Sequence, residues 1–395
     1  METKRIVMTS TFYPPYHLGG DATHVKALKE ELEKRGHEVH VLHSLDAFRL
    51  KSDFIPEERS QPNVHAVKGR MGKWSARGTF LTGRNRAAER GLERLVKDVR
   101  PDWVHHHNIS LLGAGVLKER DVPSVYTAHD YWLICPRSDL MFLGKETCAK
   151  RRCTYCSLAT RRPPQVWRSW GMRRALDSID LALAPSRFMA ERLHSFLGIE
   201  AKVLPNFAAA PDFGPARLGG HFSFVGVLER SKGLDLLLQA FKDERVGWGL
   251  HVMGRGSLEP MVREAEKASE GRIAYKGFLE DRALWTEVAG SQALVCPSTG
   301  NENSPLACIE ALALGVPLIV SSRGGLPELV DAPECGIVAG LSPGSLADAL
   351  VRLSDPVIRE RLAKNAFIRY QMNHQPGIYV ESYLRLCEEM EIDAA

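Results

Sequence analysis

The feature that most restricts the fold of this chain is an alternation of short apolar segments with amphipathic segments of helical length. In residues 23–36, for example, apolar residues recur at helical spacing and a glycine follows, as it often does at the end of a helix. Apolar runs typical of strands lie at residues 5–12, 37–45, 102–108, 123–130 and 181–186. This alternation predicts an α/β fold with a doubly wound parallel sheet.

The same alternation returns in the second half, with runs at residues 221–228, 249–256, 272–279, 292–298, 317–324 and 335–340. The chain has 395 residues, which is more than one hydrophobic core usually serves. We therefore predict two doubly wound, Rossmann-like domains that face one another across a cleft. The predicted parts are residues 1–205 with an insert at about 135–156, a Pro-, Gly- and Ala-rich linker at 206–219, residues 220–375, and a C-terminal helix in 376–395 that packs back on the first domain.

The charge of the chain is small but unevenly distributed. A net charge of +4 does not indicate a nucleic-acid partner. However, residues 68–86 carry six basic side chains and no acid, and residues 145–174 carry nine against one acid, with aromatic residues between them. Such a surface suits phosphate groups or anionic lipid headgroups. The apolar run near the N-terminus is shorter than a signal peptide needs, and no apolar segment reaches the length of a membrane span. We therefore expect a cytoplasmic protein that can associate with the inner face of the membrane.

Glycine-rich loops follow several predicted strands, at the edge where open α/β sheets bind ligands. Arg230 and Lys232 lie between Gly226 and Gly233, just before a predicted helix. Two cations beside a helix N-terminus form an anion site. The other candidate ligand-binding glycines at strand ends are Gly19 and Gly20, Gly254, and Gly324 and Gly325, the last pair followed by Pro327, which suits the start of a helix.

Two glutamates stand at the start of a very apolar helix. Glu310 is the only polar residue between Leu306 and Leu314, and burying a carboxylate without hydrogen bonds costs several kcal/mol. We therefore predict that Glu310 accepts hydrogen bonds from sugar hydroxyls, as acids do with ribose in nucleotide-binding folds. Glu302 precedes the helix, on the loop over the cleft. Asn303 or Ser304 is expected to cap this helix and Pro305 to begin it.

Histidines also mark a predicted strand end. His129 and Asp130 follow an apolar run, and we expect both to face the cleft. His105, His106 and His107 are consecutive on a predicted strand, so they cannot all face one metal ion.

Together these motifs resemble the retaining glycosyltransferases of family 4, which have the GT-B fold, over nearly the whole chain. Glu302 and Glu310 match the E-x7-E motif of that family, and Lys232 matches the lysine of its glycine loop. Many members have an arginine where this chain has Val227, so Arg230 is the candidate substitute. The remaining matches are the N-terminal glycine loop (Gly19, Gly20), the GG-x-P-E loop (Gly324, Gly325, Pro327, Glu328) and the donor-side histidine (His129).

The resemblance implies transfer of a hexosyl group, with retention, from a nucleotide-diphosphate sugar to a polysaccharide, glycolipid or lipid-linked acceptor. It favours a UDP-sugar as donor. It places Glu310 on the donor ribose, Glu302 on the transferred sugar, and Arg230 with Lys232 on the diphosphate; Asn303 and Ser304 are expected beside the donor. The chain has no D-x-D sequence, so we expect cations and helix dipoles to stabilise the leaving group without a catalytic metal.

Four cysteines are spaced C-x12-C-x4-C-x2-C: Cys135, Cys148, Cys153 and Cys156. A C-x2-C pair is a usual half of a tetrahedral zinc site, so the pattern predicts a structural zinc ion, with an iron–sulfur cluster or no metal as alternatives. Arg151 and Arg152 lie in the same insert. With Asp130 they are predicted to receive a phosphorylated or lipid-linked glycan acceptor.

Two other functions are compatible with this pattern. One is a sugar-nucleotide epimerase or a phosphorylase built on two similar domains, although the chain offers no clear lysine for a pyridoxal cofactor. The other is a non-catalytic module that binds a sugar nucleotide and senses metal or redox state through its cysteines. The presence of both glutamates together with Lys232 favours the transferase.

Overall fold

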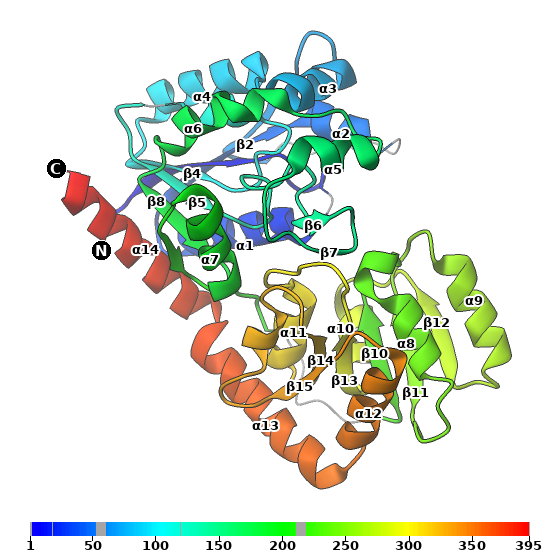
Figure 1. Ribbon diagram of the computed structural model, residues 1–395. Coiled ribbons are helices and arrows are strands. Elements are labelled where there is room, and N and C mark those ends of the chain that lie inside the picture. The colour runs from blue at the N-terminus through cyan, green and yellow to red at the C-terminus, as the bar shows by residue number, and fades with distance from the viewer. Residues whose placement is uncertain (1, 18, 53–60, 119, 211–218, 395) are drawn as a thin grey trace. The chain divides into compact units, whose positions relative to one another are not determined.

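A computed structural model describes residues 2–17, 19–52, 61–118, 120–210 and 219–394. The chain forms two compact units (Figure 1). The first comprises Met1–Leu204 and Tyr379–Ala395, and the second comprises Pro205–Ile378. Most of the predicted linker, residues 211–218, lies outside the described residues.

The first unit is built on a seven-stranded parallel sheet in the order β3-β2-β1-β4-β5-β8-β9. Figure 1 shows α4 over one face of this sheet and α1 over the other. The strands are β1 (Arg5–Ser10), β2 (Glu38–Ser44), β3 (Val64–Val67), β4 (Trp103–His106), β5 (Ser124–Thr127), β8 (Leu181–Ala184) and β9 (Ala201–Val203). The helices are α1 (Gly20–Lys34), α2 (Leu45–Lys51), α3 (Lys73–Thr82), α4 (Arg86–Val99), α5 (Cys153–Ala159), α6 (Gly171–Leu176) and α7 (Arg187–Leu197), with short 3-10 turns η1 (Ala114–Leu117) and η2 (Val166–Ser169).

The second unit is built on a six-stranded parallel sheet in the order β12-β11-β10-β13-β14-β15. Its strands are β10 (His221–Val225), β11 (Gly249–Met253), β12 (Ile273–Gly277), β13 (Ser291–Cys296), β14 (Leu318–Ser321) and β15 (Gly336–Ala339). Its helices are α8 (Leu234–Ala240), α9 (Glu259–Ala268), α10 (Asp281–Ala289), α11 (Leu306–Ala313), α12 (Pro343–Leu353) and α13 (Pro356–Asn373), with 3-10 turns η3 (Arg230–Lys232) and η4 (Leu326–Leu329). The predicted fold class, two doubly wound parallel sheets, is confirmed.

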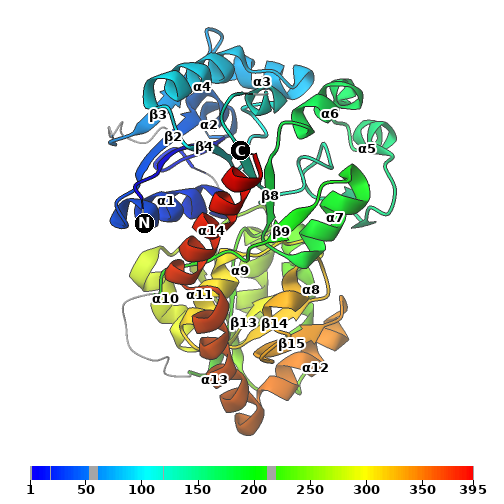
Figure 2. The same cartoon turned by 90° about the vertical axis from the view of Figure 1, so that its left-hand side faces the viewer.

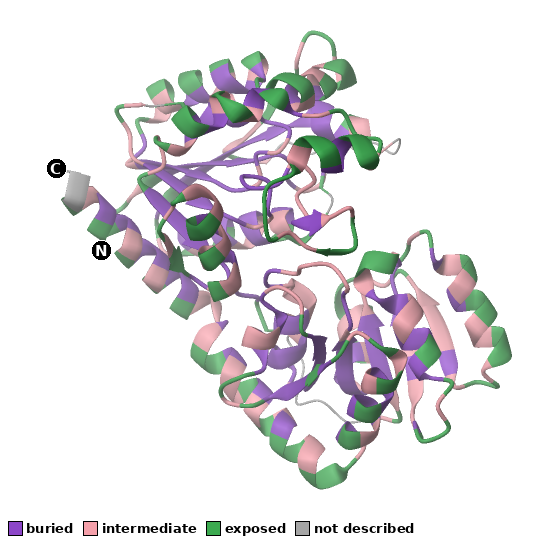
Figure 3. Cartoon of the chain, viewed as in Figure 1, coloured by how far each residue is buried: buried purple, intermediate pink, exposed green. Residues whose placement is uncertain are grey.

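Burial explains why the strands read as continuous apolar runs. A parallel sheet with helices on both faces buries the side chains of both faces. In β1, every residue from Ile6 to Ser10 is buried, and β14 is buried throughout. Figure 3 shows the central strands of both sheets as mainly buried, whereas the edge strands β3, β9 and β12 are partly exposed.

The C-terminal helix α14 (Pro376–Ala394) joins the first unit from Tyr379 onward and lies beside α1 in both views (Figures 1 and 2). The indole Nε1 of Trp103 donates to the hydroxyl of Tyr383 at 2.8 Å, and both side chains are buried. At the other end of the helix, the Lys4 ammonium lies 2.9 Å from the Glu391 carboxylate. The helix therefore completes the core of the N-terminal sheet.

A small antiparallel hairpin, β6 (Met141–Phe142) and β7 (Glu146–Thr147), stands outside the seven-stranded sheet. It lies in the cysteine-containing insert, between β5 and α5. The sequence pattern did not predict it, because strands of two residues leave no periodic signal.

Candidate functional site

The strand order of the second unit determines where its loops meet. Its first strand, β10, has β11 on one side and β13 on the other, so the order reverses between β10 and β13. Ligands of open α/β sheets bind beyond the carboxyl ends of the strands at such a reversal. The two loops that leave β10 and β13 at this point carry Lys232 and Glu302, respectively.

The loop after β10 is packed closely on the loop after β13. Gly233 has φ +69°, and a Cβ atom there would lie 1.9 Å from the carbonyl oxygen of Pro297. The backbone N–H groups of Thr299 and Gly300 donate to the carbonyl of Ser231 at 2.9 and 3.0 Å. The glycine is therefore required both by its left-handed backbone and by the close contact between the two loops.

Lys232 and Glu302 form an ion pair between these loops. The Lys232 ammonium donates to Oε1 of Glu302 at 2.6 Å, and the Ser298 hydroxyl donates to the same oxygen at 3.1 Å. Burial alone would lower the pKa of Lys232, but attraction to Glu302 and the hydrogen bond between them outweigh it and raise that pKa. The lysine thus stays charged and retains an exposed fraction of 33% through which an anion can reach it.

Arg230, the other predicted cation, lies in η3 with its side chain exposed. Among the described residues it has no ion-pair partner. Its side chain is therefore not held by an ion pair, whereas that of Lys232 is held by Glu302.

The glycine pair after β14 supports the backbone of Glu302. The Gly325 amide donates to the Glu302 carbonyl at 2.8 Å, and a Cβ atom on Gly324 would lie 1.9 Å from the same oxygen. The α-helix expected from Pro327 is wrong, because η4 is a 3-10 turn of four residues. This loop therefore positions a neighbouring residue and does not present the N-terminus of a long helix.

The expected cap of helix α11 is also wrong. The helix begins at Leu306, one residue later than predicted, with Pro305 in the cap position and no side-chain cap. Asn303 and Ser304 are buried, too early in the chain to cap it, and the Ser304 carbonyl accepts a hydrogen bond of 2.9 Å from the Asn206 amide. Both residues thus belong to the packed loop that carries Glu302.

Glu310 lies on α11, two turns after Glu302, and is largely buried. Burial raises the pKa of its carboxyl group to about 7. None of the described residues gives this carboxylate an ion pair or a hydrogen bond. An arginine partner, which would remove the need for a ligand, is therefore absent from the described part of the chain.

The perturbed pKa of Glu310 predicts a pH-dependent stability. The folded state holds the proton up to about pH 7, whereas an ordinary glutamate releases it near 4.5. Folded protein therefore binds more protons in this range, and its stability falls as the pH rises through it. We expect the free energy of unfolding of Glu310→Gln, relative to that of the wild type, to rise by about 2–3 kcal/mol between pH 5 and pH 8.

Urea unfolding at the two pH values measures this effect. The matched control is Glu360→Gln, because Glu360 is an exposed residue of α13. The stability of Glu360→Gln should vary with pH as that of the wild type does. If the stability of Glu310→Gln also varies with pH as that of the wild type does, burial does not raise the pKa of Glu310.

Gly254 ends the neighbouring strand β11. Its amide donates to the Gly277 carbonyl at 2.8 Å, and its own carbonyl accepts a hydrogen bond of 3.0 Å from the Tyr275 hydroxyl. Its Cα lies close to the Gly226 carbonyl, because a Cβ atom there would be 1.8 Å from that oxygen. The loops after β10 and β11 are therefore in contact as well.

The N-terminal unit has an equivalent reversal of strand order between β1 and β4. Gly19 is the cap residue of α1 and Gly20 its first residue, and no side chain caps this helix. Leu18, just before them, lies outside the described residues. Asp21 accepts a hydrogen bond of 2.7 Å from the amide of Asn108, which follows β4. Asp21 and Asn108, which the sequence did not single out, thus join the two loops.

His129 and Asp130 follow β5 at the same edge of the sheet. The rings of His107 and His129 share a hydrogen bond of 2.9 Å, and the His24 ring lies edge-on to His129. Burial lowers the pKa of His129 to about 4 and raises the pKa of Asp130 to about 7. His129 is therefore a neutral hydrogen-bonding group at neutral pH.

The two histidines of β4 itself bond to different strands. His105 pairs with Thr127 and His106 with Thr9, each at 2.8 Å. They point in alternate directions, as expected for neighbours on a strand. The described residues contain no three-ligand metal group among them.

The two basic segments of the sequence meet in the structure. The Trp167 indole donates to the Phe80 carbonyl at 3.2 Å, and its ring lies against Gly83. This contact joins α3 to η2. Exposed basic side chains of the two segments include Lys73, Arg77, Arg151, Arg152, Arg161, Arg162, Arg173 and Arg174, and exposed aromatics include Trp74, Tyr155 and Trp170. We call this set the basic–aromatic surface.

The four predicted zinc ligands are brought together in the first unit. Cys135, Cys148, Cys153 and Cys156 all line one small cavity beside the β6–β7 hairpin. All four are free thiols in the described chain.

Two doubly wound units, each with polar side chains at the reversal of its strand order, define a two-domain α/β protein of the kind that binds nucleotides and sugars. Comparison with known proteins identifies the family. The model of "Glycosyltransferase Family 4" matches residues 18–208, and that of "Glycosyl transferases group 1" matches residues 219–355. The chain belongs to the glycosyltransferases of family 4, which have the GT-B fold, and the predicted family and fold are confirmed.

Individual relatives match over most of their length. A glycogen synthase from Mycobacterium tuberculosis is 28% identical, over 92% of this chain and 89% of that protein. A GDP-mannose-dependent alpha-(1-6)-phosphatidylinositol dimannoside mannosyltransferase from the same species is 25% identical, over 88% of this chain and 86% of that protein. The solved structure of a sucrose-phosphate synthase from Thermosynechococcus elongatus aligns with a TM-score of 0.76 at 18% identity, over 99% of this chain and 100% of that one.

Proposed function

We propose that this glycosyltransferase moves a hexosyl group, with retention of configuration, from a nucleotide-diphosphate sugar, a UDP-sugar in the first instance, to a glycan acceptor. The observation that carries the proposal is the arrangement at the strand reversal of the second unit. A charged lysine is held at 2.6 Å from Glu302, and a buried glutamate without a protein partner lies two helical turns further on. These are the groups that a diphosphate and a set of sugar hydroxyls need.

Charge development explains the role of Lys232. As the sugar–phosphate bond breaks, negative charge grows on the departing diphosphate, and a preorganised cation stabilises the transition state more than the ground state. Glu302 holds the ammonium in place before the donor binds. Arg230, exposed on the same turn, can close on the diphosphate as a second cation.

The glutamates have separate roles. Glu310 accepts hydrogen bonds from the donor ribose, which completes the hydrogen bonding of its buried carboxylate. Glu302 orients the transferred sugar with one oxygen while the other bonds to Lys232. Of the predicted donor-binding glycines, Gly324 and Gly325 act by holding the backbone of Glu302, and Gly19, Gly20 and Gly254 are proposed to contact the donor through their backbone.

Retention and metal independence are part of the proposal. The chain offers no D-x-D sequence, and Lys232 supplies the positive charge that a divalent ion would supply elsewhere. The departing phosphate oxygen takes the proton of the acceptor hydroxyl as the new bond forms on the same face of the sugar. His129, neutral at pH 7, serves as a hydrogen-bond donor or acceptor to the sugar beside it.

The direct test is release of free nucleotide from a panel of UDP-, GDP- and ADP-sugars. The wild type should release nucleotide from at least one donor, and Glu302→Gln should reduce that rate by about 10²-fold or more. Proton NMR of the product should show the anomeric configuration of the donor. An inverted product would overturn retention, and the absence of release from every donor would contradict the transferase itself.

The acceptor is proposed to be phosphorylated or lipid-linked and to meet the basic–aromatic surface, with Asp130 beside it as a site for its hydroxyl group. Exposed aromatic and cationic side chains together suit an interface that is partly apolar and partly anionic. We also propose that the protein is cytoplasmic and binds the inner face of the membrane through this surface. No helix in the described residues is long and apolar enough to cross a membrane.

Charge removal tests the surface. A variant in which Gln replaces Arg151 and Arg152 of the insert, together with Arg161 and Arg162 just after α5, should bind phosphatidylglycerol vesicles about 10²-fold or more weakly at low salt. Each cation near an anionic surface contributes about 1 kcal/mol to binding. Vesicle co-sedimentation measures this. The matched control replaces four exposed basic residues of the second unit, Lys242, Arg263, Lys267 and Lys364, and should bind like the wild type. Equal binding by both variants would contradict the proposal.

A further inference from the structure

The cysteine-containing insert has very little regular structure of its own. Its hairpin consists of two strands of two residues each, joined at Leu143–Lys145. Such a hairpin is at best marginally stable in water. Ser138, Leu140 and Leu143 all have positive φ angles, between +52° and +62°, which side chains seldom adopt. An additional tie is needed to hold this segment in one conformation.

Four thiols converge where this tie is needed. Cys135 precedes the hairpin, Cys148 follows it, and Cys153 and Cys156 lie in the first turn of α5. All four line one cavity of about 20 Å³. A cavity of that size has room for a single small occupant such as a water molecule or an ion.

Polar and basic groups surround the cavity. The backbone N–H of Leu143 donates to the sulfur of Cys156 at 3.4 Å. Arg137 and Arg152 also line the cavity, so positive side chains stand beside the four sulfurs. Four thiolates around one Zn²⁺ carry net negative charge, which these side chains would compensate.

We propose that Cys135, Cys148, Cys153 and Cys156 bind one zinc ion, which fixes the β6–β7 hairpin to the start of α5. Four thiolates leave no open coordination position, so the ion is structural. The site follows His129 and Asp130 in the chain and carries Arg151 and Arg152 between its ligands. The zinc therefore stabilises the loop that presents these two arginines, whichever acceptor the enzyme uses.

The four sulfurs do not yet lie at metal–ligand spacing. Within the described residues, the group whose ligand atoms all fall within 4.8 Å of one another is His221, His251 and Glu287. Zinc binding would draw the thiolates inward to Zn–S distances of about 2.3 Å. The short hairpin and the exposed segment between Lys150 and Arg152 provide the freedom for this movement.

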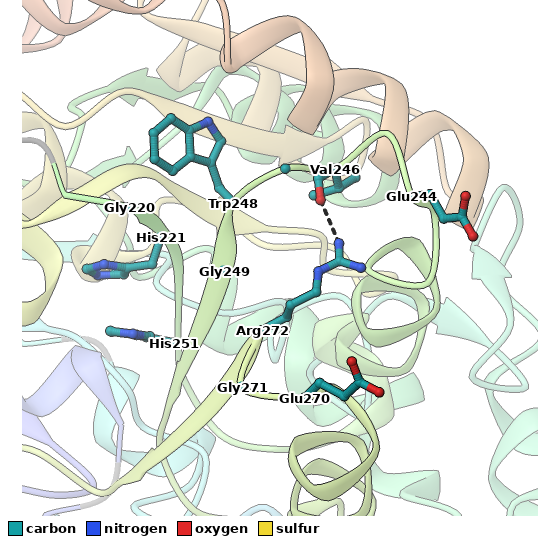
Figure 4. A pocket seen from close by; sticks show the side chains of 11 residues that line it. Gly220, His221, Glu244, Val246, Trp248, Gly249, His251, Glu270, Gly271 and Arg272 are labelled. Carbon is teal, nitrogen blue, oxygen red and sulfur yellow. Dashed lines mark hydrogen bonds between the residues drawn. The ribbon is translucent and has the colours of Figure 1, made fainter.

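The histidine group is explained without a metal. The His221 and His251 rings are stacked 3.7 Å apart at the edge of a pocket that also contains Trp248 (Figure 4). His251 bonds to the Glu287 carboxylate at 2.7 Å, and His221 bonds to the Glu287 carbonyl at 3.1 Å. The Lys276 ammonium lies 3.5 Å from the same carboxylate, which disfavours a second cation there. This group therefore serves as the control for the zinc experiment.

The test uses the full chain without a histidine tag, purified from zinc-supplemented medium and dialysed. Mass spectrometry of the metals should find about one zinc per chain, and titration of the wild type with a mercurial should release that zinc as about four thiols react. Exchange for Co²⁺ should give the charge-transfer absorption of thiolate ligands, which histidine and carboxylate ligands do not produce.

Variants separate the two groups. Cys153→Ser with Cys156→Ser should lose the zinc and the cobalt absorption, whereas His221→Ala with His251→Ala should retain both. The wild-type measurements keep the proposal testable if the cysteine variant does not fold. Three results would each overturn the proposal. They are loss of zinc from the histidine variant alone, iron with acid-labile sulfide in place of zinc, and a wild type that takes up no metal.

Discussion

Replacement of Lys232 by alanine is expected to lower turnover by about 10²–10³-fold, while the protein remains folded. The lysine is the cation fixed at the strand reversal of the second unit, at 2.6 Å from Glu302. Its removal takes away the charge that stabilises the departing diphosphate and leaves Glu302 with negative charge where the diphosphate must bind. Lys232→Arg should recover part of the loss, because it restores the charge with a different shape.

Steady-state nucleotide release measures this effect. The matched control is Lys29→Ala, which breaks another lysine–glutamate pair of 2.6 Å, between Lys29 and Glu33 on α1. It should leave turnover unchanged. A Lys232→Ala protein with wild-type turnover would exclude the lysine from the reaction.

Replacement of Gly324 by alanine is expected to cost at least about 2 kcal/mol of stability and about 10²-fold in turnover. The added Cβ atom would lie 1.9 Å from the Glu302 carbonyl oxygen, and the glycine has φ +62°. The nearest atoms to this Cβ all belong to the backbone of Glu302, so rotation of a side chain cannot relieve the collision. Glu302 must therefore move, and its carboxylate loses the geometry it has with Lys232.

A second glycine separates the collision from the backbone strain. Gly315 has φ +70°, but a Cβ atom there would meet nothing closer than 3.6 Å. Gly315→Ala should therefore lose stability through strain alone and keep its turnover per folded molecule. Equal losses of turnover in the two variants, measured with unfolding curves on the same samples, would show that the contact with Glu302 is unimportant.

The sequence predicted the sheets because burial on both faces of a parallel strand leaves a short continuous apolar run, as in residues 6–8 of β1. The family resemblance assigned both Lys232 and Glu302 to the donor, but their ion pair was not predicted, because the order of the strands that precede them cannot be read from the sequence. The sequence also could not predict that Ser298 bonds to Glu302, because a serine in a loop has no periodic or spacing signal.

Two errors have a common cause. Pro305 and Pro327 were each expected at the first position of an α-helix, but Pro305 precedes its helix and Pro327 lies in a 3-10 turn. Proline fixes φ near −65°, which suits helix starts, 3-10 turns and extended residues alike. Here the loop contacts of Glu302 and Ser304 determine the backbone. The junction of α3 with η2 through Trp167 was unpredictable for a related reason, because it joins segments 87 residues apart.

The central claim is that sugar hydroxyls of an activated donor complete the hydrogen bonding of Glu310. Free Glu310 has a pKa of about 7, and hydrogen bonds to its carboxylate should lower that pKa when the donor binds. The most direct measurement is calorimetric titration of UDP-, GDP- and ADP-sugars at pH 7 in two buffers with different ionisation enthalpies. The account predicts that at least one donor binds and releases a fraction of a proton, and that Glu310→Gln abolishes this release. Donor binding with the same proton release in Glu310→Gln, or no binding by any donor, would contradict it.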